Sequence, residues 1–251
     1  MHQFFIEEQQ IHEKQIIITG ADAHHMLHVL RLKPGEEVSV RVTEPVSERF
    51  REAELRCAFS GAFGDDAELE LLFIKQDNVE LPVKIRLYQG LPKADKMELI
   101  IQKAVELGAS AVVPVMTKRC VSDWKGKAEK KRERLQLIAE AAAKQAHRGI
   151  LPEVALPVSF GDALKEAAAL GKVFVPYELA EGMDRTRELF TAIEPGDVIS
   201  VFIGPEGGFT EEEVQTAKDA GAECITLGRR ILRTETAGLY VLSVLGYLSE
   251  S

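Results

Sequence analysis

The sequence predicts an α/β protein in which a small β-rich domain precedes a larger domain built on a parallel sheet. Residues 37–42, 53–59 and 68–74 alternate between polar and apolar side chains, or are apolar throughout, over strand lengths. After Pro82, strand-like and helix-like segments alternate, which predicts a parallel sheet with helices on both faces. The polar stretch 75–82, which contains this proline, is the predicted linker between the two domains.

The first domain contains a single predicted helix among its strands. We expect that helix from Asp22 to Leu32, in the segment DAHHMLHVLRL, and the turn KPGE at 33–36 ends it. Short strands around one helix predict a small β-barrel, which we place over residues 1–74.

The second domain is predicted over residues 83–251. Strands are expected at 83–90, 111–116, 172–177, 197–204 and 223–228, and helices at 95–109, about 126–147, 160–169, 211–220 and 235–248. Asp95 and Glu98 have the spacing of a capping box at the start of the first of these helices. The last helix is apolar almost all round, which predicts burial on every side, either inside the domain or at a subunit interface.

Length and composition are those of an ordinary soluble protein. The chain has 251 residues, of which 45% are hydrophobic and 28% are charged. No apolar run approaches the roughly 18 residues of a membrane span, and the start MHQFFIEEQQ becomes acidic too early for a signal peptide. Cys57, Cys120 and Cys224 lie far apart without CxxC spacing, so we expect free, buried thiols in a reducing cytoplasm.

The charge of the chain is unevenly distributed. The formal net charge is −9, which argues weakly against a nucleic-acid partner. Residues 118–134, however, hold eight basic and three acidic side chains, a local net charge of +5. Two interpretations stay open for this segment: a solvated helix face with internal ion pairs, or a patch that contacts phosphates.

A glycine-rich turn, VFIGPEGGFTEEE at 201–213, follows the strand predicted at 197–204. In open α/β sheets, ligands bind beyond the carboxyl ends of strands, so this turn is a candidate site. The turn has no Gly-Lys-Ser/Thr, does not match GxGxxG, and no acidic residue closes a suitable strand about twenty residues further on.

The helix after the turn argues further against a phosphate ligand. Thr210 and Glu213 have the spacing of a capping box, and Glu211 and Glu212 fill the rest of the first helical turn. These carboxylates suit the positive end of the helix dipole and would repel a pyrophosphate there. We therefore expect a cofactor without phosphate, with the glycines allowing close approach of the backbone, although they could simply turn the chain.

A second loop, LGRRILRTETA at 227–237, follows the strand predicted at 223–228 and enters the last helix. Gly228 again permits close backbone approach, and three arginines add positive charge at the same edge of the sheet. Thr234 or Thr236 is expected to cap the helix.

Four segments, which occur along the chain in the order that the family has them, resemble motifs of the bacterial 16S rRNA uridine N3-methyltransferases, the RsmE family. This family belongs to the SPOUT class of S-adenosylmethionine (SAM) enzymes. The segments are IGPEGGFTEEE, LGRRILRTETA, KMELIIQKAVELGA and IAEAAAKQAHRGILPEV, and HHMLHVLRLKPGE in the first domain is also similar. The resemblance implies a PUA-like RNA-binding barrel, a SPOUT domain with a C-terminal trefoil knot, and a cytoplasmic homodimer. It implies a substrate in 16S rRNA or the small ribosomal subunit, with no membrane or metal partner.

SAM is a sulfonium without phosphate, so it suits the glutamate-rich helix start. By resemblance, it binds in a bend formed by the two loops. The predicted cofactor-binding residues are Gly204, Glu206, Gly207, Gly208, Leu227, Gly228, Ile231 and Leu232.

Methylation at N3 of uracil requires loss of the N3 proton, and it needs no covalent nucleophile. A cation beside the uracil oxygens would stabilise the developing anion, and a base or water chain would take the proton. The candidate catalytic residues are Arg230, Arg233, Arg148 and Glu235. For Glu206 and Glu235, the favoured interpretation is that each pairs with these arginines and so holds the loops.

RNA contacts are expected from both domains, and by resemblance we assign them to Arg31, Arg119, Glu140, Gln145 and Arg148. His24 and His28 share a helix face, but no HExxH pattern accompanies them, which argues against a metal. By resemblance their segment belongs to the RNA-binding domain, which implies a sugar or phosphate contact. Trp124 could stack on a base or pack internally. The rival functions are methylation of another RNA nucleotide, a non-catalytic RNA-binding or ribosome-assembly protein, and an enzyme of nucleotide phosphates.

Overall fold

The computed structural model describes residues 1–93, 95–124, 126–178, 180 and 182–250. The chain divides into two compact units. The first comprises Met1–Glu80 together with Ala143–Leu151, and the second comprises Leu81–Ala142 together with Pro152–Ser251. The sequence places a simple linker at 75–82, but strand β6 continues to Gln76, and a segment from the middle of the chain clusters with the first unit.

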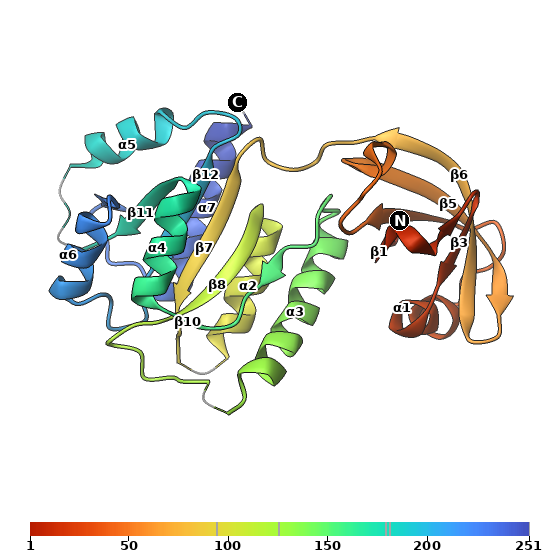
Figure 1. The fold of residues 1–251 in the computed structure, drawn as a ribbon, viewed down its shortest axis with the longest axis horizontal. Helices are drawn as coiled ribbons and strands as arrows, with labels where there is room; N and C mark the ends of the chain where they lie inside the picture. The colour runs from red at the N-terminus through yellow and green to blue at the C-terminus, as the bar shows by residue number, and fades with distance from the viewer. Residues whose placement is uncertain (94, 125, 179, 181, 251) are drawn as a thin grey trace. The chain divides into compact units, whose positions relative to one another are not determined.

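The first unit is built on a curled sheet with the strand order β1-β4-β5-β6-β3-β2 (Figure 1). Strand β1 pairs in parallel with β4, and the other neighbours pair antiparallel. The buried side chains of Ile16, Val40, Leu55 and Leu69 form its core with Met26 from the helical segment. The strands are β1 (Gln3–Ile6), β2 (Ile11–His12), β3 (Gln15–Ile18), β4 (Glu37–Val42), β5 (Ala53–Phe63) and β6 (Asp66–Gln76).

The predicted helix of the first unit is present but begins earlier. Helix α1 (Gly20–His24) continues into a π-helical segment, His25–Leu30, which ends at Arg31. Arg31 has a φ of 54°, the left-handed conformation that ends many helices. Strands β1 and β3 were not predicted, because each is only four residues long and lacks a clear alternation.

The second unit is built on a parallel sheet with the order β10-β8-β7-β12-β11-β13, and β9 also pairs with β8. Every pairing among its described strands is parallel, as the alternation of strands and helices predicts. The strands are β7 (Lys84–Gly90), β8 (Ala109–Met116), β9 (Glu153–Val154), β10 (Val158–Ser159), β11 (Lys172–Pro176), β12 (Val198–Ile203) and β13 (Glu223–Ile225).

Helices cover both faces of this sheet. Helices α2 (Lys96–Glu106), α5 (Met183–Thr191) and α7 (Thr234–Ser249) pack on one face, and α4 (Phe160–Leu170) and α6 (Glu211–Asp219) pack on the other. Figure 1 shows α4 in front of the sheet and α7 behind it. The remaining helix, α3, runs from Ala128 to Gln145. The mixed α/β fold class is therefore confirmed, whereas the trefoil knot stays a prediction, because strand order does not determine whether a chain passes through a loop.

Several local predictions differ from the structure. Asp95 is the N-cap of α2 but makes no side-chain capping bond, and the carboxylate of Glu98 instead pairs with Arg134 at 2.5 Å. Helix α5 was not predicted, because only Thr186 and Phe190 are buried on it and the apolar period is weak.

The last helix is not buried on every side. Within this chain, α7 buries Val241, Leu242 and Leu245 on one face, while Tyr240 and Tyr247 are exposed on the other. Because α7 is apolar almost all round, its exposed face is apolar too.

All three cysteines are free, but only Cys57 is buried, and Cys120 and Cys224 are half-buried. Burial raises the pKa of Cys57 to about 12. In the described part of the chain, no helix is both long and apolar enough to span a membrane.

The centre of the parallel sheet depends on aromatic packing between neighbouring strands. Tyr88 on β7 and Phe202 on β12 stack with ring centroids 4.5 Å apart, and Phe160 of α4 meets Phe202 edge-on at 5.9 Å. Phe202 has no exposed surface.

We expect Phe202→Ala to lower the free energy of unfolding by about 3–5 kcal/mol, because it leaves a cavity between β7, β12 and α4. Urea unfolding measures this loss. Leu137→Ala, at an exposed position on α3, is the control and should change stability by less than about 0.5 kcal/mol. Equal losses in the two variants would contradict the assigned core.

Candidate functional site

The glycine turn follows β12 directly and closes tightly on itself. Gly208 has a φ of 64°, and its N–H donates to the carbonyl of Pro205 at 2.8 Å. A Cβ on Gly204 would lie 3.0 Å from the Cα of Gly208, and a Cβ on Gly207 would lie 3.2 Å from the side chain of Arg119. The turn therefore requires glycine at 204, where the backbone approaches closely, and at 208, where φ is positive although a Cβ would meet open space; at 207 a Cβ would press on the side chain of Arg119.

The second loop leaves β13 at Ile225 and reaches α7 at Thr234. Gly228 has a φ of 101°, and its N–H donates to the hydroxyl of Thr226 at 3.3 Å. A Cβ on Gly228 would meet no atom within 4 Å, so this position also faces open space.

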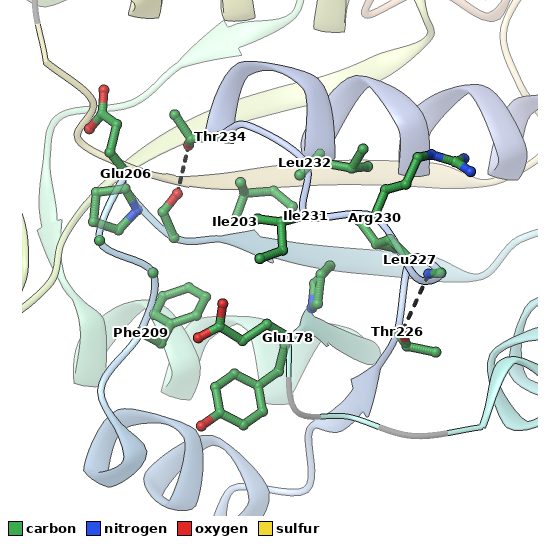
Figure 2. Close-up of a pocket in the computed structure, with 18 of the residues that line it drawn as sticks. Glu178, Ile203, Glu206, Phe209, Thr226, Leu227, Arg230, Ile231, Leu232 and Thr234 are labelled. Carbon is green, nitrogen blue, oxygen red and sulfur yellow. Dashed lines mark hydrogen bonds between the residues drawn. The ribbon is translucent and has the colours of Figure 1, made fainter.

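The two loops enclose a cavity of about 250 Å³ at the carboxyl end of the parallel sheet (Figure 2). All eight residues predicted to bind the cofactor line this cavity, although they come from segments twenty residues apart. Arg230, predicted as catalytic, lines it too. The lining residues are Pro176, Tyr177, Glu178, Ile203, Gly204, Pro205, Glu206, Gly207, Gly208, Phe209, Thr226, Leu227, Gly228, Arg229, Arg230, Ile231, Leu232, Thr234 and Ala237.

A buried chain of hydrogen bonds joins the two loops to the centre of the sheet. The Nε2 of Gln89, at the end of β7, donates to the hydroxyl of Thr234 at 2.8 Å. That hydroxyl donates to the carbonyl of Gly204 at 2.6 Å (Figure 2). The prediction that Thr234 or Thr236 caps α7 is therefore wrong: Arg233 is the N-cap, without a side-chain capping bond, and Thr234 holds the glycine turn.

Lys96 at the start of α2 holds the outer side of the same turn. Its ammonium lies 3.0 Å from the carboxylate of Glu206 and 3.1 Å from that of Glu235. The backbone N–H of Lys93 also donates to Glu206, at 3.1 Å. Glu206 and Glu235 thus form ion pairs that hold the two loops, as the sequence analysis favours. Their main partner, however, is Lys96 rather than an arginine.

This network shifts the pKa of each member. Burial works to raise the pKa of Glu206, but hydrogen bonds from Lys96 and from backbone N–H groups outweigh it and hold that pKa below 4.5. A backbone hydrogen bond, opposed by burial and assisted by Lys96, lowers the pKa of Glu235. Hydrogen bonds to Glu206 and Glu235 raise the pKa of Lys96 above 10.5. The ion pairs are therefore fully charged at neutral pH.

The start of α6 is capped by its own side chains. Thr210 and Glu213 form the predicted capping box, with bonds of 3.2 and 2.8 Å. Glu213 is buried and also accepts from the N–H of Lys118 at 2.7 Å. None of residues 210–213 lines the cavity, so the first-turn N–H groups of α6 do not face a ligand there.

The basic segment 118–134 supplies part of the scaffold. The Nη1 of Arg119 donates to the carbonyl of Gly207 at 2.8 Å, and the ammonium of Lys118 pairs with Glu212. Trp124 is buried, with the ammonium of Lys131 5.5 Å from its ring centroid, so it packs internally. Arg119 was predicted to contact RNA, and in the structure its guanidinium bonds to the glycine turn.

The predicted catalytic arginines occupy different surroundings. The guanidinium of Arg230 is exposed and, in Figure 2, extends away from Phe209 and Glu178. Arg233 is 82% exposed and lies 4.0 Å from Glu235. Arg148 belongs to the first unit, where its side chain is buried against Glu80 at 2.5 Å. Its surroundings are those of a structural ion pair.

The other residues predicted to contact RNA are Arg31, Glu140 and Gln145. Arg31 is exposed in the first unit, and Gln145 is the last residue of α3. The rings of His24 and His28 lie 4.7 Å apart. Within the described ranges, no group of three or more potential metal ligands is present.

Sequence reasoning missed three residues that shape the site: Gln89, Lys96 and Glu178. Gln89 is a buried polar residue next to the last position of β7, directly before Gly90, and a polar residue at the end of a predicted strand is a signal in the sequence. Lys96 lies in the first turn of a predicted helix, where its sequence position gives no sign of a partner in either loop. Glu178 lies just beyond the end of β11, a neighbour of β12 that comes earlier in the sequence.

Apolar side chains and glycine backbone line this cavity together with Glu178, Glu206, Arg229 and Arg230, a combination that suits a small ligand with an apolar ring and polar groups. A family model of an RNA methyltransferase domain matches residues 79–246, and one of an RNA methyltransferase PUA domain matches residues 18–43. These matches place the chain among the RNA methyltransferases with a PUA-like first domain.

Curated relatives identify the family to which the chain belongs among the RNA methyltransferases. Ribosomal RNA small subunit methyltransferase E of Bacillus subtilis is 35% identical over 100% of this chain and 98% of its own length. The protein of that name from Mesomycoplasma hyopneumoniae is 30% identical over 97% of this chain and 98% of its own length. The chain belongs to the ribosomal RNA small subunit methyltransferase E family.

A solved structure is similar over the whole chain. Ribosomal RNA small subunit methyltransferase E from Neisseria gonorrhoeae, bound to S-adenosyl methionine, is 30% identical. It superposes with a TM-score of 0.82 and covers 99% of this chain and 98% of that one.

We expect Glu206→Gln to lower the free energy of unfolding by about 1 kcal/mol at pH 7, because it removes the partner of Lys96. A carboxylate with a lowered pKa stabilises the fold fully above its ordinary pKa of 4.5, and this contribution is lost as the pH falls through the lowered value. The stability difference between wild type and variant should therefore be constant from pH 6 to 8 and shrink below about pH 4.5.

Urea unfolding at a series of pH values measures this difference. Glu211→Gln removes an exposed carboxylate from the start of α6 and is the matched control. A stability difference that changes between pH 6 and 8 would contradict the assigned ion pair.

Proposed function

We propose that this protein transfers the methyl group of SAM to N3 of a uracil in 16S rRNA. The chain is a SAM-dependent methyltransferase of small-subunit ribosomal RNA, as its family membership indicates. The observation that carries the proposal is the cavity itself, because the two loops that resemble the family motifs meet there and line it together.

The cavity fits the cofactor by its chemistry. Ile203, Phe209, Leu227, Ile231 and Leu232 offer apolar surface for an adenine ring. Gly208 and Gly228 leave open space where a side chain would otherwise stand. When bound, SAM supplies an electrophilic methyl group, and the residues of the two loops hold and orient it.

The arginines of the second loop suit the substrate side of the reaction. Arg230 lines the cavity, and neither it nor Arg229 has a hydrogen-bond or ion-pair partner among the described residues. We propose that Arg230, with the exposed Arg233, stabilises negative charge on the uracil oxygens as the N3 proton leaves. Glu235 acts in this scheme by holding the loop through Lys96.

Arg148 is also engaged, since it forms a buried ion pair with Glu80. We therefore assign Arg148 to support of the RNA-binding surface of the first unit rather than to the chemical step. Arg31, Glu140 and Gln145 keep their proposed roles as RNA contacts, and residues 1–74 are proposed as the RNA-binding domain, consistent with the PUA match.

We propose a homodimer in the cytoplasm, where bacterial ribosomal RNA is found. Tyr240, Tyr247 and Leu248 form an exposed apolar face on α7. Leu99 is exposed on the neighbouring helix α2. An apolar surface of this kind suits contact with a second copy of the chain. Free cysteines fit the same compartment.

Mass spectrometry of nucleosides tests the reaction directly. Purified protein incubated with SAM and either free 16S rRNA or small subunits should produce 3-methyluridine. A methyl group on another nucleotide would contradict the N3 assignment. Cofactor binding without any methylation of either substrate would favour the non-catalytic alternative.

We expect Arg230→Ala and Arg233→Ala to slow methyl transfer about 100-fold, because each removes positive charge from the developing anion. The dissociation constant for SAM should rise less than about five-fold, since neither guanidinium is needed for the cavity. Single-turnover kinetics and calorimetry measure the two effects. Arg187→Ala, an exposed site on α5, is the control. A larger effect on SAM binding than on the rate would remove these side chains from the chemical step.

A further inference from the structure

Glu178 is the acidic residue of the cavity that remains available to a ligand. Glu178 and Glu206 are the carboxylates among the lining residues, and Glu206 is engaged by Lys96 and by the N–H of Lys93. Glu178 is exposed and has no hydrogen-bond or ion-pair partner within the described part of the chain. Figure 2 shows its side chain extending between Phe209 and Ile231, into the space that the loops enclose.

The position of Glu178 in the sheet indicates what it contacts. Strands β11 and β12 pair in parallel, with Phe174 opposite Val201. Glu178 lies two residues beyond the end of β11, and the glycine turn starts at Gly204, directly after β12. The two features therefore stand at the carboxyl ends of neighbouring parallel strands.

The same juxtaposition recurs in dinucleotide-binding α/β folds. There, a glycine-rich turn follows one parallel strand, and an acidic side chain at the end of a nearby strand hydrogen-bonds a ribose hydroxyl. In this protein the acidic residue comes before the glycine turn in the sequence. A search for an acidic residue about twenty positions after the turn consequently finds nothing, although the structure supplies one.

We propose that the carboxylate of Glu178 accepts hydrogen bonds from the ribose hydroxyls of the cofactor. This inference rests on the proposed function, since it concerns the nucleoside of SAM. Two adjacent hydroxyls match the two oxygens of a carboxylate, and hydrogen bonds to an ionised acceptor are among the stronger ones in proteins. Apolar side chains of the cavity offer surface for the base, and Glu178 is the lining carboxylate without a described protein partner that can fix the orientation of the nucleoside.

Calorimetry with a set of ligands tests this contact. The variant Glu178→Gln should bind SAM and its demethylated product, S-adenosylhomocysteine, about ten-fold or more weakly than the wild type, as expected for loss of bonds to a charged acceptor. Methylthioadenosine, which keeps the ribose but lacks the amino acid, should weaken by the same factor. A 2′,3′-dideoxy form of S-adenosylhomocysteine should bind wild type and variant equally.

The matched control is Glu211→Gln, which removes an exposed carboxylate outside the cavity and should leave all affinities unchanged. Unchanged binding of S-adenosylhomocysteine to Glu178→Gln would overturn this inference and leave the proposed function standing. Weaker binding of SAM and S-adenosylhomocysteine but not of methylthioadenosine would also overturn it, in favour of an amino-group contact. Weaker binding of SAM alone would point to the sulfonium instead. A wild type that binds no SAM would overturn the proposed function as well.

Discussion

The buried hydrogen bonds from Gln89 through Thr234 to the carbonyl of Gly204 are the interaction on which the site depends. They tie together the end of β7, the start of α7 and the glycine turn. Gln89 has no exposed surface and Thr234 is 6% exposed, so water cannot easily replace these bonds. Buried polar groups are costly to leave unpaired, which favours a single arrangement of the three segments. The loops can therefore be long and rich in glycine and still define a cavity.

Charged residues hold the outside of the same turn and leave its inside to a ligand. Lys96, at the start of α2, forms ion pairs with Glu206 and Glu235, and the guanidinium of Arg119 donates a hydrogen bond to the carbonyl of Gly207. Each of these groups is used by the scaffold, so none is available to neutralise a ligand. Among the described lining residues, the charges left over are Glu178 and the arginines of the second loop.

The sequence alone predicted the layers of the fold because they depend on local periodicity. Strand β4 and the capping box at Thr210 were located to the residue. Short elements such as β1 and weakly amphipathic ones such as α5 were missed, since four residues, or a helix with two buried side chains, carry little pattern. The glycine positions of the site could be predicted from their motifs. The partners of Thr234 and Arg119 could not, because those contacts join residues 30 and 88 positions apart.

The order of the strands explains why a carboxylate lies beside the glycine turn and why the sequence motifs do not predict it. The capping box at the start of α6 uses N–H groups that would otherwise bind a phosphate, and the helix start lies outside the cavity lining. A parallel neighbour, β11, instead brings a carboxylate to the edge of the glycine turn. A carboxylate repels phosphate and accepts from hydroxyl or ammonium groups, so the same residue disfavours nucleotides and favours a nucleoside. The placement of this carboxylate beside the glycine turn therefore follows from which strands are adjacent, a property that no single motif contains.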